Sequence, residues 1–103
     1  MTTFDDREKA FENKFIHDEE LKFKVEARRS KLVGLWAAGI LGRTGDKAVA
    51  YAREVVAADI SERGAEDVFR KLSTDLGGLA DAATIRAQMG VAMDEAKRQL
   101  MNE

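Results

Sequence analysis

Few residues of this chain have types and spacings that could take part in chemistry. The stretch GILGRTGDKA is similar to a phosphate-binding loop, but Asp46 separates Gly45 from Lys47, and an acidic side chain there would repel phosphate. We therefore interpret the stretch as a turn between helices. His17 is the single histidine and lies beside Asp18, with no nucleophile paired to it. We interpret it as a solvated residue rather than a catalytic base.

The remaining candidates for ligand binding are also weak. The chain has no cysteine and one histidine, which excludes a disulfide framework, a thiolate zinc site and a histidine cluster. The cations Arg28, Arg29 and Lys31 could meet an anion, but charged runs of this kind usually form a solvated helix face. We expect no enzymatic activity, no catalytic or cofactor-binding residues and no metal site.

Composition limits the fold and the class of partner. The chain has 103 residues, no proline and 35% charged residues, yet a net charge of only -2. Alanine, leucine, lysine, glutamate and arginine favour helix, and the near balance of charge argues against a nucleic-acid binder. The N-terminus MTTFDDREKAFE is too charged for a signal peptide, and the longest apolar run, residues 32–41, is too short to span a bilayer. We expect a cytoplasmic protein that is not inserted in a membrane.

Glycines divide the chain into four predicted helices. Glycine just past a helical pattern is the usual stop signal, because it adopts the left-handed conformation without strain. The predicted helices cover residues 3–41, 46–62, 65–76 and 82–101. Thr44 or Asp46 can cap the second helix and Asp81 the fourth. The short connections predict an all-α four-helix bundle with a long first helix.

Each predicted helix carries a stripe of apolar residues that we expect to face a shared core. The stripes are Leu21, Val25, Leu32, Trp36 and Ile40; Val49, Ala52, Val56 and Ile60; Val68, Phe69, Leu72, Leu76 and Leu79; and Ile85, Met89, Ala92, Met93, Ala96 and Leu100.

The N-terminal part of the first helix lacks such a stripe. Before Leu21, the apolar face consists of Phe4, Phe11 and Phe15, and acids are in excess over residues 5–20, whereas bases are in excess over 22–31. Burying three phenylalanines would contribute roughly 5–9 kcal/mol. Ordering some 15 residues costs about 1–2 kcal/mol each. We therefore expect a mobile segment at residues 1–19 and a bundle at 20–103. The segment is either a solvated tail or a helix that folds on binding a partner.

Four blocks in order resemble one protein family. FDDRE at residues 4–8, ARR at 27–29, GLWAAGILG at 34–42 and EDVFRKL at 66–72 resemble the zeta subunit, the ATPase inhibitor of α-proteobacterial F-type ATP synthases. The resemblance runs nearly end to end, with the same spacing and length. It implies a four-helix bundle peripheral to the membrane-bound synthase.

The resemblance also implies a partner and a mechanism. An inhibitory N-terminal segment inserts at a catalytic interface of the synthase and blocks rotation in the hydrolytic direction. The residues that match this segment are Phe4, Asp5, Asp6, Arg7, Glu8, Phe11, Lys14 and Phe15. Weak binding of purine nucleotides is implied for some members, and it maps to no residue here. The alternatives are a nucleotide-binding regulatory module and a helical adaptor for a different partner.

Overall fold

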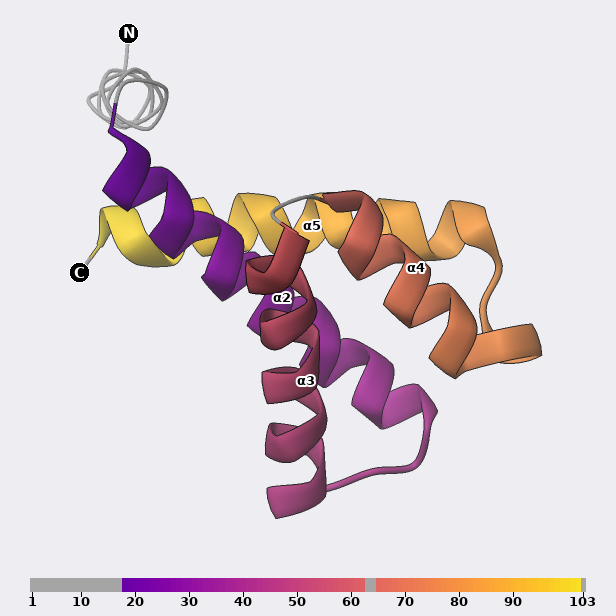
Figure 1. Ribbon diagram of the computed structural model, residues 1–103. Helices are drawn as coiled ribbons and strands as arrows, with labels where there is room; N and C mark the ends of the chain where they lie inside the picture. Colours follow the sequence, from indigo (N-terminus) through magenta and orange to yellow (C-terminus); the bar gives the residue numbers. More distant parts are fainter. Residues whose placement is uncertain (1–17, 63–64, 103) are drawn as a thin grey trace, which may run out of the picture.

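The computed structural model describes residues 18–62 and 65–102. This part of the chain is helical and contains no strand, which confirms the predicted all-α four-helix bundle (Figure 1). The elements are α2 (Glu19–Ile40), α3 (Asp46–Glu62), α4 (Ala65–Leu76), the short 3-10 helix η1 (Gly77–Leu79) and α5 (Ala82–Met101). The bounds predicted for the last three α-helices are confirmed. None of the described helices is long and apolar enough to cross a membrane.

Helix α2 begins at Glu19, later than the predicted start at residue 3. Asp18 has an extended backbone, with φ -118° and ψ 102°, and its side chain accepts a hydrogen bond from the backbone N–H of Leu21. This N-cap satisfies an N–H that the helix itself leaves without a partner. One uninterrupted helix over residues 3–41 is therefore wrong at Asp18, and residues 1–17 lie outside the described part of the chain.

Helix α2 is the central element of the bundle. It contacts α3, α4 and α5, while α4 also contacts α3 and α5. Figure 1 shows α3 crossing α2, and the C-terminal end of α5 beside the N-terminal end of α2. The turns that reverse the chain use left-handed glycines, Gly42 at φ +77° after α2 and Gly77 at φ +54° after α4. Asp81 caps α5 as predicted, accepting from Thr84 N–H at 2.8 Å.

The buried residues of α4 and α5 confirm most of the apolar stripes predicted on these two helices. Val68, Leu72 and Leu76 of α4 are buried, as are Ile85, Met89, Ala92 and Ala96 of α5. Phe69, Met93 and Leu100 are only partly buried, and Leu79 is 63% exposed, because η1 turns the chain away from the α4 stripe.

The stripes predicted on α2 and α3 are confirmed only in part: Val25 and Ala52 are buried as predicted, but the other core residues of these helices are not the predicted ones. On α2 the core takes Val25, Val33 and Ala37, whereas Leu32 and Trp36 are only partly buried. Ile40 of the same stripe is 36% exposed. On α3 the core takes Tyr51, Ala52 and Val55, and Val49 is 43% exposed. One reason is that the small residues Gly34 and Ala52 take part in the close contact between α2 and α3, and large residues alone do not mark that face.

Gly34 marks the closest approach of α2 to α3. A Cβ atom at this position would lie 2.9 Å from the Ala52 Cα and 3.2 Å from the Val55 Cγ2. A backbone Cα cannot move aside as the end of a flexible side chain can. The residue must therefore stay without a side chain for the two helices to pack at this distance.

Two glycine substitutions should change stability in opposite directions. Gly34→Ala should lower the free energy of unfolding by about 1–3 kcal/mol, because the added methyl forces α2 and α3 apart. Gly90→Ala is the matched control, since nothing lies within 4 Å of a Cβ there and the residue is inside α5. It should raise the free energy by about 0.5–1 kcal/mol through helix propensity. Urea unfolding measures both, and a neutral Gly34→Ala would contradict the close contact.

Candidate protein-interaction surface

The residues predicted to bind a partner lie outside the described part of the chain. They are Phe4, Asp5, Asp6, Arg7, Glu8, Phe11, Lys14 and Phe15, and His17 lies there too. The described part of the chain includes the start of α2, where this segment joins the bundle, and the surfaces around it.

Tyr51 has the most strongly shifted pKa among the described residues. Its hydroxyl donates to Asp75 Oδ2 at 2.8 Å, and Lys71 Nζ donates to the same oxygen at 2.9 Å. The Arg43 guanidinium and the Lys71 ammonium lie 5.0 and 5.2 Å from the centre of the phenol ring. This cluster ties the α2–α3 loop, α3 and α4 together.

The pKa shifts of this cluster fit a structural role. Burial, and then the hydrogen bond to Asp75, raise the pKa of Tyr51 far above its ordinary value, so the phenol stays protonated. Burial alone would raise the pKa of Asp75, but hydrogen bonds from Lys71 and Tyr51 outweigh it and leave that pKa below its ordinary value. A protonated phenol and an ionised carboxylate hold each other in place. Among the described residues, no group of histidine and carboxylate side chains could hold a metal ion.

The three cations Arg28, Arg29 and Lys31 of α2 lie in three different environments, so they do not form one solvated face. Arg29 is 4% exposed and its Nη2 lies 3.5 Å from Oδ1 of Asp59, which is 5% exposed. Arg28 donates to Gln99 Oε1 on α5 at 2.7 Å. Lys31 alone is exposed, as the sequence predicted.

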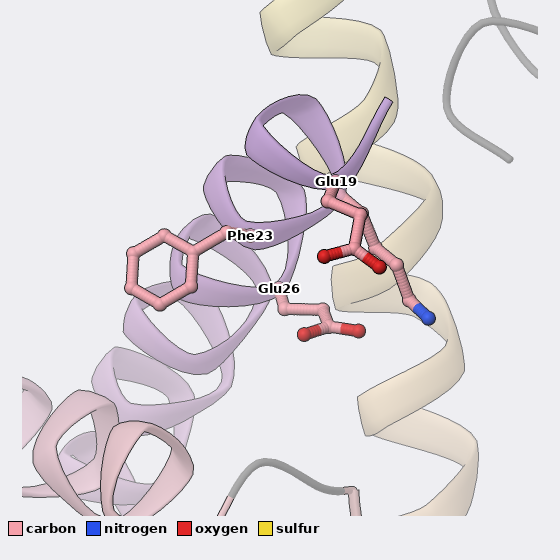
Figure 2. A pocket seen from close by; sticks show the side chains of 4 residues that line it. Glu19, Phe23 and Glu26 are labelled. Carbon is pink, nitrogen blue, oxygen red and sulfur yellow. The ribbon is translucent and has the colours of Figure 1, made fainter. Parts of the chain in front are cut away.

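Figure 2 shows the start of α2, where the N-terminal segment joins the bundle. Glu19 and Glu26 lie on one side of the helix, and the Phe23 ring points away on the other. A hollow of about 140 Å³ lies here, lined by Glu19, Lys22, Phe23 and Glu26. Three of these four side chains are charged, and the hollow is small. It therefore provides little apolar area for a partner.

A larger depression runs along the other side of α2, and we call it the basic groove. Its first half, of about 470 Å³, is lined by Phe23, Lys24, Ala27, Arg28, Lys31, Val56 and Leu100. Its second half, of about 310 Å³, is lined by Lys31, Leu35, Val49, Ala52, Arg53 and Val56. Lys31 and Val56 belong to both halves, so the two form one continuous surface.

The basic groove combines apolar walls with positive charge. Phe23 is 38% and Val49 43% exposed, and none of the described residues that line the groove is acidic. Apolar area with one sign of charge is typical of a surface that binds a protein segment of the opposite sign. The sequence did not predict this groove, because Val49 and Val56 fit the apolar stripe of residues 46–62 and Phe23 lies outside the stripe of the preceding helix. Large apolar residues alternating with cations on α2 were the available signal.

Comparisons with known proteins agree with the resemblance seen in the sequence. A family model described as ATPase inhibitor subunit zeta matches residues 1–99. One solved structure, obtained by NMR in solution, is 54% identical with a TM-score of 0.73. The alignment covers 80% of this chain and 96% of that one. No curated protein matches the chain.

The buried ion pair should be costly to break on one side. Arg29→Ala or Asp59→Ala should each lower the free energy of unfolding by about 3–5 kcal/mol, because a buried charge is left uncompensated. Arg29→Met combined with Asp59→Leu should recover most of this loss. Arg70→Ala is the control, since the Arg70–Asp67 pair has an arginine side chain that is 70% exposed, and it should cost less than about 1 kcal/mol. Urea unfolding in which the single changes match this control would refute the buried pair.

Tyr51 should titrate abnormally, and it is the chain's only tyrosine. Its folded-state pKa lies above the ordinary 10.0, so its stabilising effect is complete below pH 10 and is lost as the pH rises further. The depressed pKa of Asp75 acts in the opposite range: its contribution is complete above pH 3.8 and is lost as the pH falls below that value. Phenolate absorbance should therefore rise only as the protein unfolds in alkali. A reversible titration near pH 10 with the fold intact would contradict this assignment. Tyr51→Phe should lower the free energy of unfolding by about 1 kcal/mol at pH 7.

Proposed function

We propose that this chain, which belongs to the ATPase inhibitor subunit zeta family, inhibits ATP hydrolysis by an F-type ATP synthase through its N-terminal segment. The observation that carries the proposal is the family match over residues 1–99, which includes both the segment and the bundle. On this proposal the chain is a binding protein at the periphery of the synthase, in the cytoplasm, and it catalyses no reaction.

The proposed mechanism is steric. Residues 1–19 insert at a catalytic interface of the synthase, with Phe4, Phe11 and Phe15 as apolar anchors and the neighbouring charges fixing the register. A wedge of this kind need only bind one rotational state better than the others. The bundle, residues 20–103, stays outside the interface and limits how far the wedge can move.

The distribution of buried residues supports separate roles for the N-terminal segment and the bundle. Among the described residues, Val25 is the first buried apolar side chain, and the core continues from there through α5. The backbone leaves the helical conformation at Asp18, which separates the segment from α2. The bundle therefore has a core to which the proposed wedge need not contribute.

Deleting residues 1–19 should abolish inhibition of ATP hydrolysis by purified α-proteobacterial F-type synthase and leave the bundle folded. The deletion removes no buried residue of the described core but does remove the Asp18 N-cap of α2, so the free energy of unfolding should fall by only about 1 kcal/mol. Changing Phe4, Phe11 and Phe15 together to alanine should have the same effect on inhibition, because they are the proposed anchors. Asn13→Ala is the matched control, since in a helix Asn13 lies opposite the three phenylalanines and should leave inhibition unchanged.

The same assay separates the alternatives. If the truncated protein inhibits at full strength, the wedge lies elsewhere in the chain. If the full chain does not inhibit the synthase at any concentration, the result favours the adaptor or the nucleotide-binding alternative. A titration of the full chain with ADP or ATP, followed by amide NMR, then tests the second of these.

A further inference from the structure

The basic groove has the dimensions to hold one more helix. Its wall on α2 is a single row of side chains at four-residue spacing, so the row lies on one face of that helix. The row consists of Phe23, Ala27, Lys31 and Leu35, and the facing wall on α3 consists of Val49, Ala52, Arg53 and Val56. The α2 row spans twelve residues, about 18 Å along the helix. Helices pack by placing a ridge of side chains into a groove of this kind.

The charge of the groove is opposite in sign to that of the whole chain. The chain has a net charge of -2, whereas the described residues that line the groove include no acid and four cations, Lys24, Arg28, Lys31 and Arg53. Lys24 forms an exposed ion pair with Glu20 at 3.7 Å, and Arg28 donates to Gln99. Lys31 and Arg53 are exposed, and neither forms an ion pair with another described residue. Their charges are therefore available to carboxylates of a partner.

The bundle favours a helical occupant over an extended one. An extended segment pairs its backbone N–H and C=O groups with the edge of a sheet, and the described part of the chain contains no strand. A helix satisfies these groups internally, so it can lie against apolar walls without leaving them unpaired. Apolar side chains at positions i, i+4, i+7 and i+11 of such a helix extend over about 16 Å, close to the length of the α2 row.

We propose that the basic groove binds an acidic amphipathic helix on the surface of the synthase, beside the interface at which the N-terminal segment acts. The inference rests on the proposed function, because it takes the synthase as the partner, and it adds a second contact that the bundle makes. The position of the groove supports this partner. It begins at Phe23, five residues after the Asp18 cap, so it lies at the end of the bundle that carries the segment.

The second contact would add to the binding of the segment without replacing it. When one site of a chain is bound, the second site binds as part of the same complex, so two weak contacts together give a higher affinity than either alone. Loss of the groove contact should therefore raise the concentration of the chain that is needed for inhibition. Full inhibition should still be reached, because the segment is unchanged.

Charge reversal in the full chain measures the contribution of the groove. Lys31→Glu together with Arg53→Glu should raise the concentration for half-maximal inhibition of ATP hydrolysis by purified synthase about tenfold. The difference should shrink as salt is added. Lys47→Glu together with Arg70→Glu is the matched control, because these exposed cations lie outside the groove and the net charge changes equally. Equal effects of the two variants would overturn the proposal.

The apolar wall of the groove is tested separately. Val49→Ser removes apolar area from a side chain that is 43% exposed, and it should weaken inhibition severalfold even at high salt. Val91→Ser is the matched control, because Val91 is 59% exposed on α5 and does not line the groove. Both variants should melt close to the unchanged chain, since both side chains are exposed. Inhibition by Val49→Ser that equals that of the control would overturn the proposal.

Photo-cross-linking identifies the occupant. The chain has no cysteine, so Val49→Cys gives a single attachment point for a benzophenone label in the groove. On illumination with the purified, lipid-free catalytic portion of the synthase, we expect a cross-link to a helical segment in which acids are in excess. The yield should be several times that from the same label on Val91→Cys. Equal yields from the two positions, or a cross-link to a segment without an acidic excess, would overturn the proposal.

Two other occupants are distinguished by the same labelled chain. A cross-link between two copies of the chain would assign the groove to self-association. Vesicles of phosphatidylglycerol, mixed with the full chain in the absence of synthase, test an anionic membrane surface. Retention on these vesicles that Lys31→Glu with Arg53→Glu abolishes, combined with no cross-link to the synthase, would assign the groove to the membrane. Either result would overturn the proposal.

These experiments separate the groove contact from the proposed function. A chain that does not inhibit, yet cross-links from Val49→Cys to an acidic helix of the synthase, would refute the proposed function and support the groove contact. Inhibition with equal concentration dependence in the groove and control variants, and no preferred cross-link from Val49→Cys, would support the function and refute the groove contact.

Discussion

The close contact between α2 and α3 at Gly34 determines how the rest of the bundle is arranged. With a side chain at this position, Ala52 could not lie against the α2 backbone, and the two helices would separate. Their approach brings Tyr51 and Val55 into the core and sets Arg29 of α2 opposite Asp59 of α3. The same crossing leaves large residues flanking the contact, and these form the walls of the basic groove. The core and the groove are therefore two consequences of one contact.

Two polar links reinforce this crossing in different ways. The Arg29–Asp59 pair is buried, and the desolvation of two charges offsets much of their attraction, so its net contribution to stability is small compared with the cost of breaking it. Such a pair favours one register of α2 against α3, because any slip would leave both charges unpaired. The Tyr51–Asp75 hydrogen bond lies nearer the surface and joins α3 to α4. Together these two side-chain links join α2, α3 and α4.

How much could be predicted from the sequence depended on the size of the residues at which each helix contacts its neighbours. Helices α4 and α5 bury one face, so their large apolar residues marked that face correctly at Leu72 and Ile85. Helix α2 contacts three helices, and its contact faces include Gly34 and Ala37, which a search for large residues does not detect. When the wrong face of α2 is assigned to the core, the face of α3 that packs against it is also assigned wrongly. Val49 is then predicted to be buried. The sparse apolar face before Leu21 predicted a division near residue 19, but the charge pattern of residues 5–31 suits one continuous helix, so the N-cap at Asp18 was not predicted.

The free energy of ordering the N-terminal segment explains why this segment would be separate from the bundle core. Ordering about 15 residues costs more than three phenylalanines recover, so the segment needs a partner surface to become a stable helix. A deep interface on a synthase can bury all three rings. An open groove such as that between Phe23 and Leu35 can bury only part of each ring, and exposed cations add little once salt screens them. Because the bundle has a core beginning at Val25, a segment that binds such an interface need not unfold the rest of the protein.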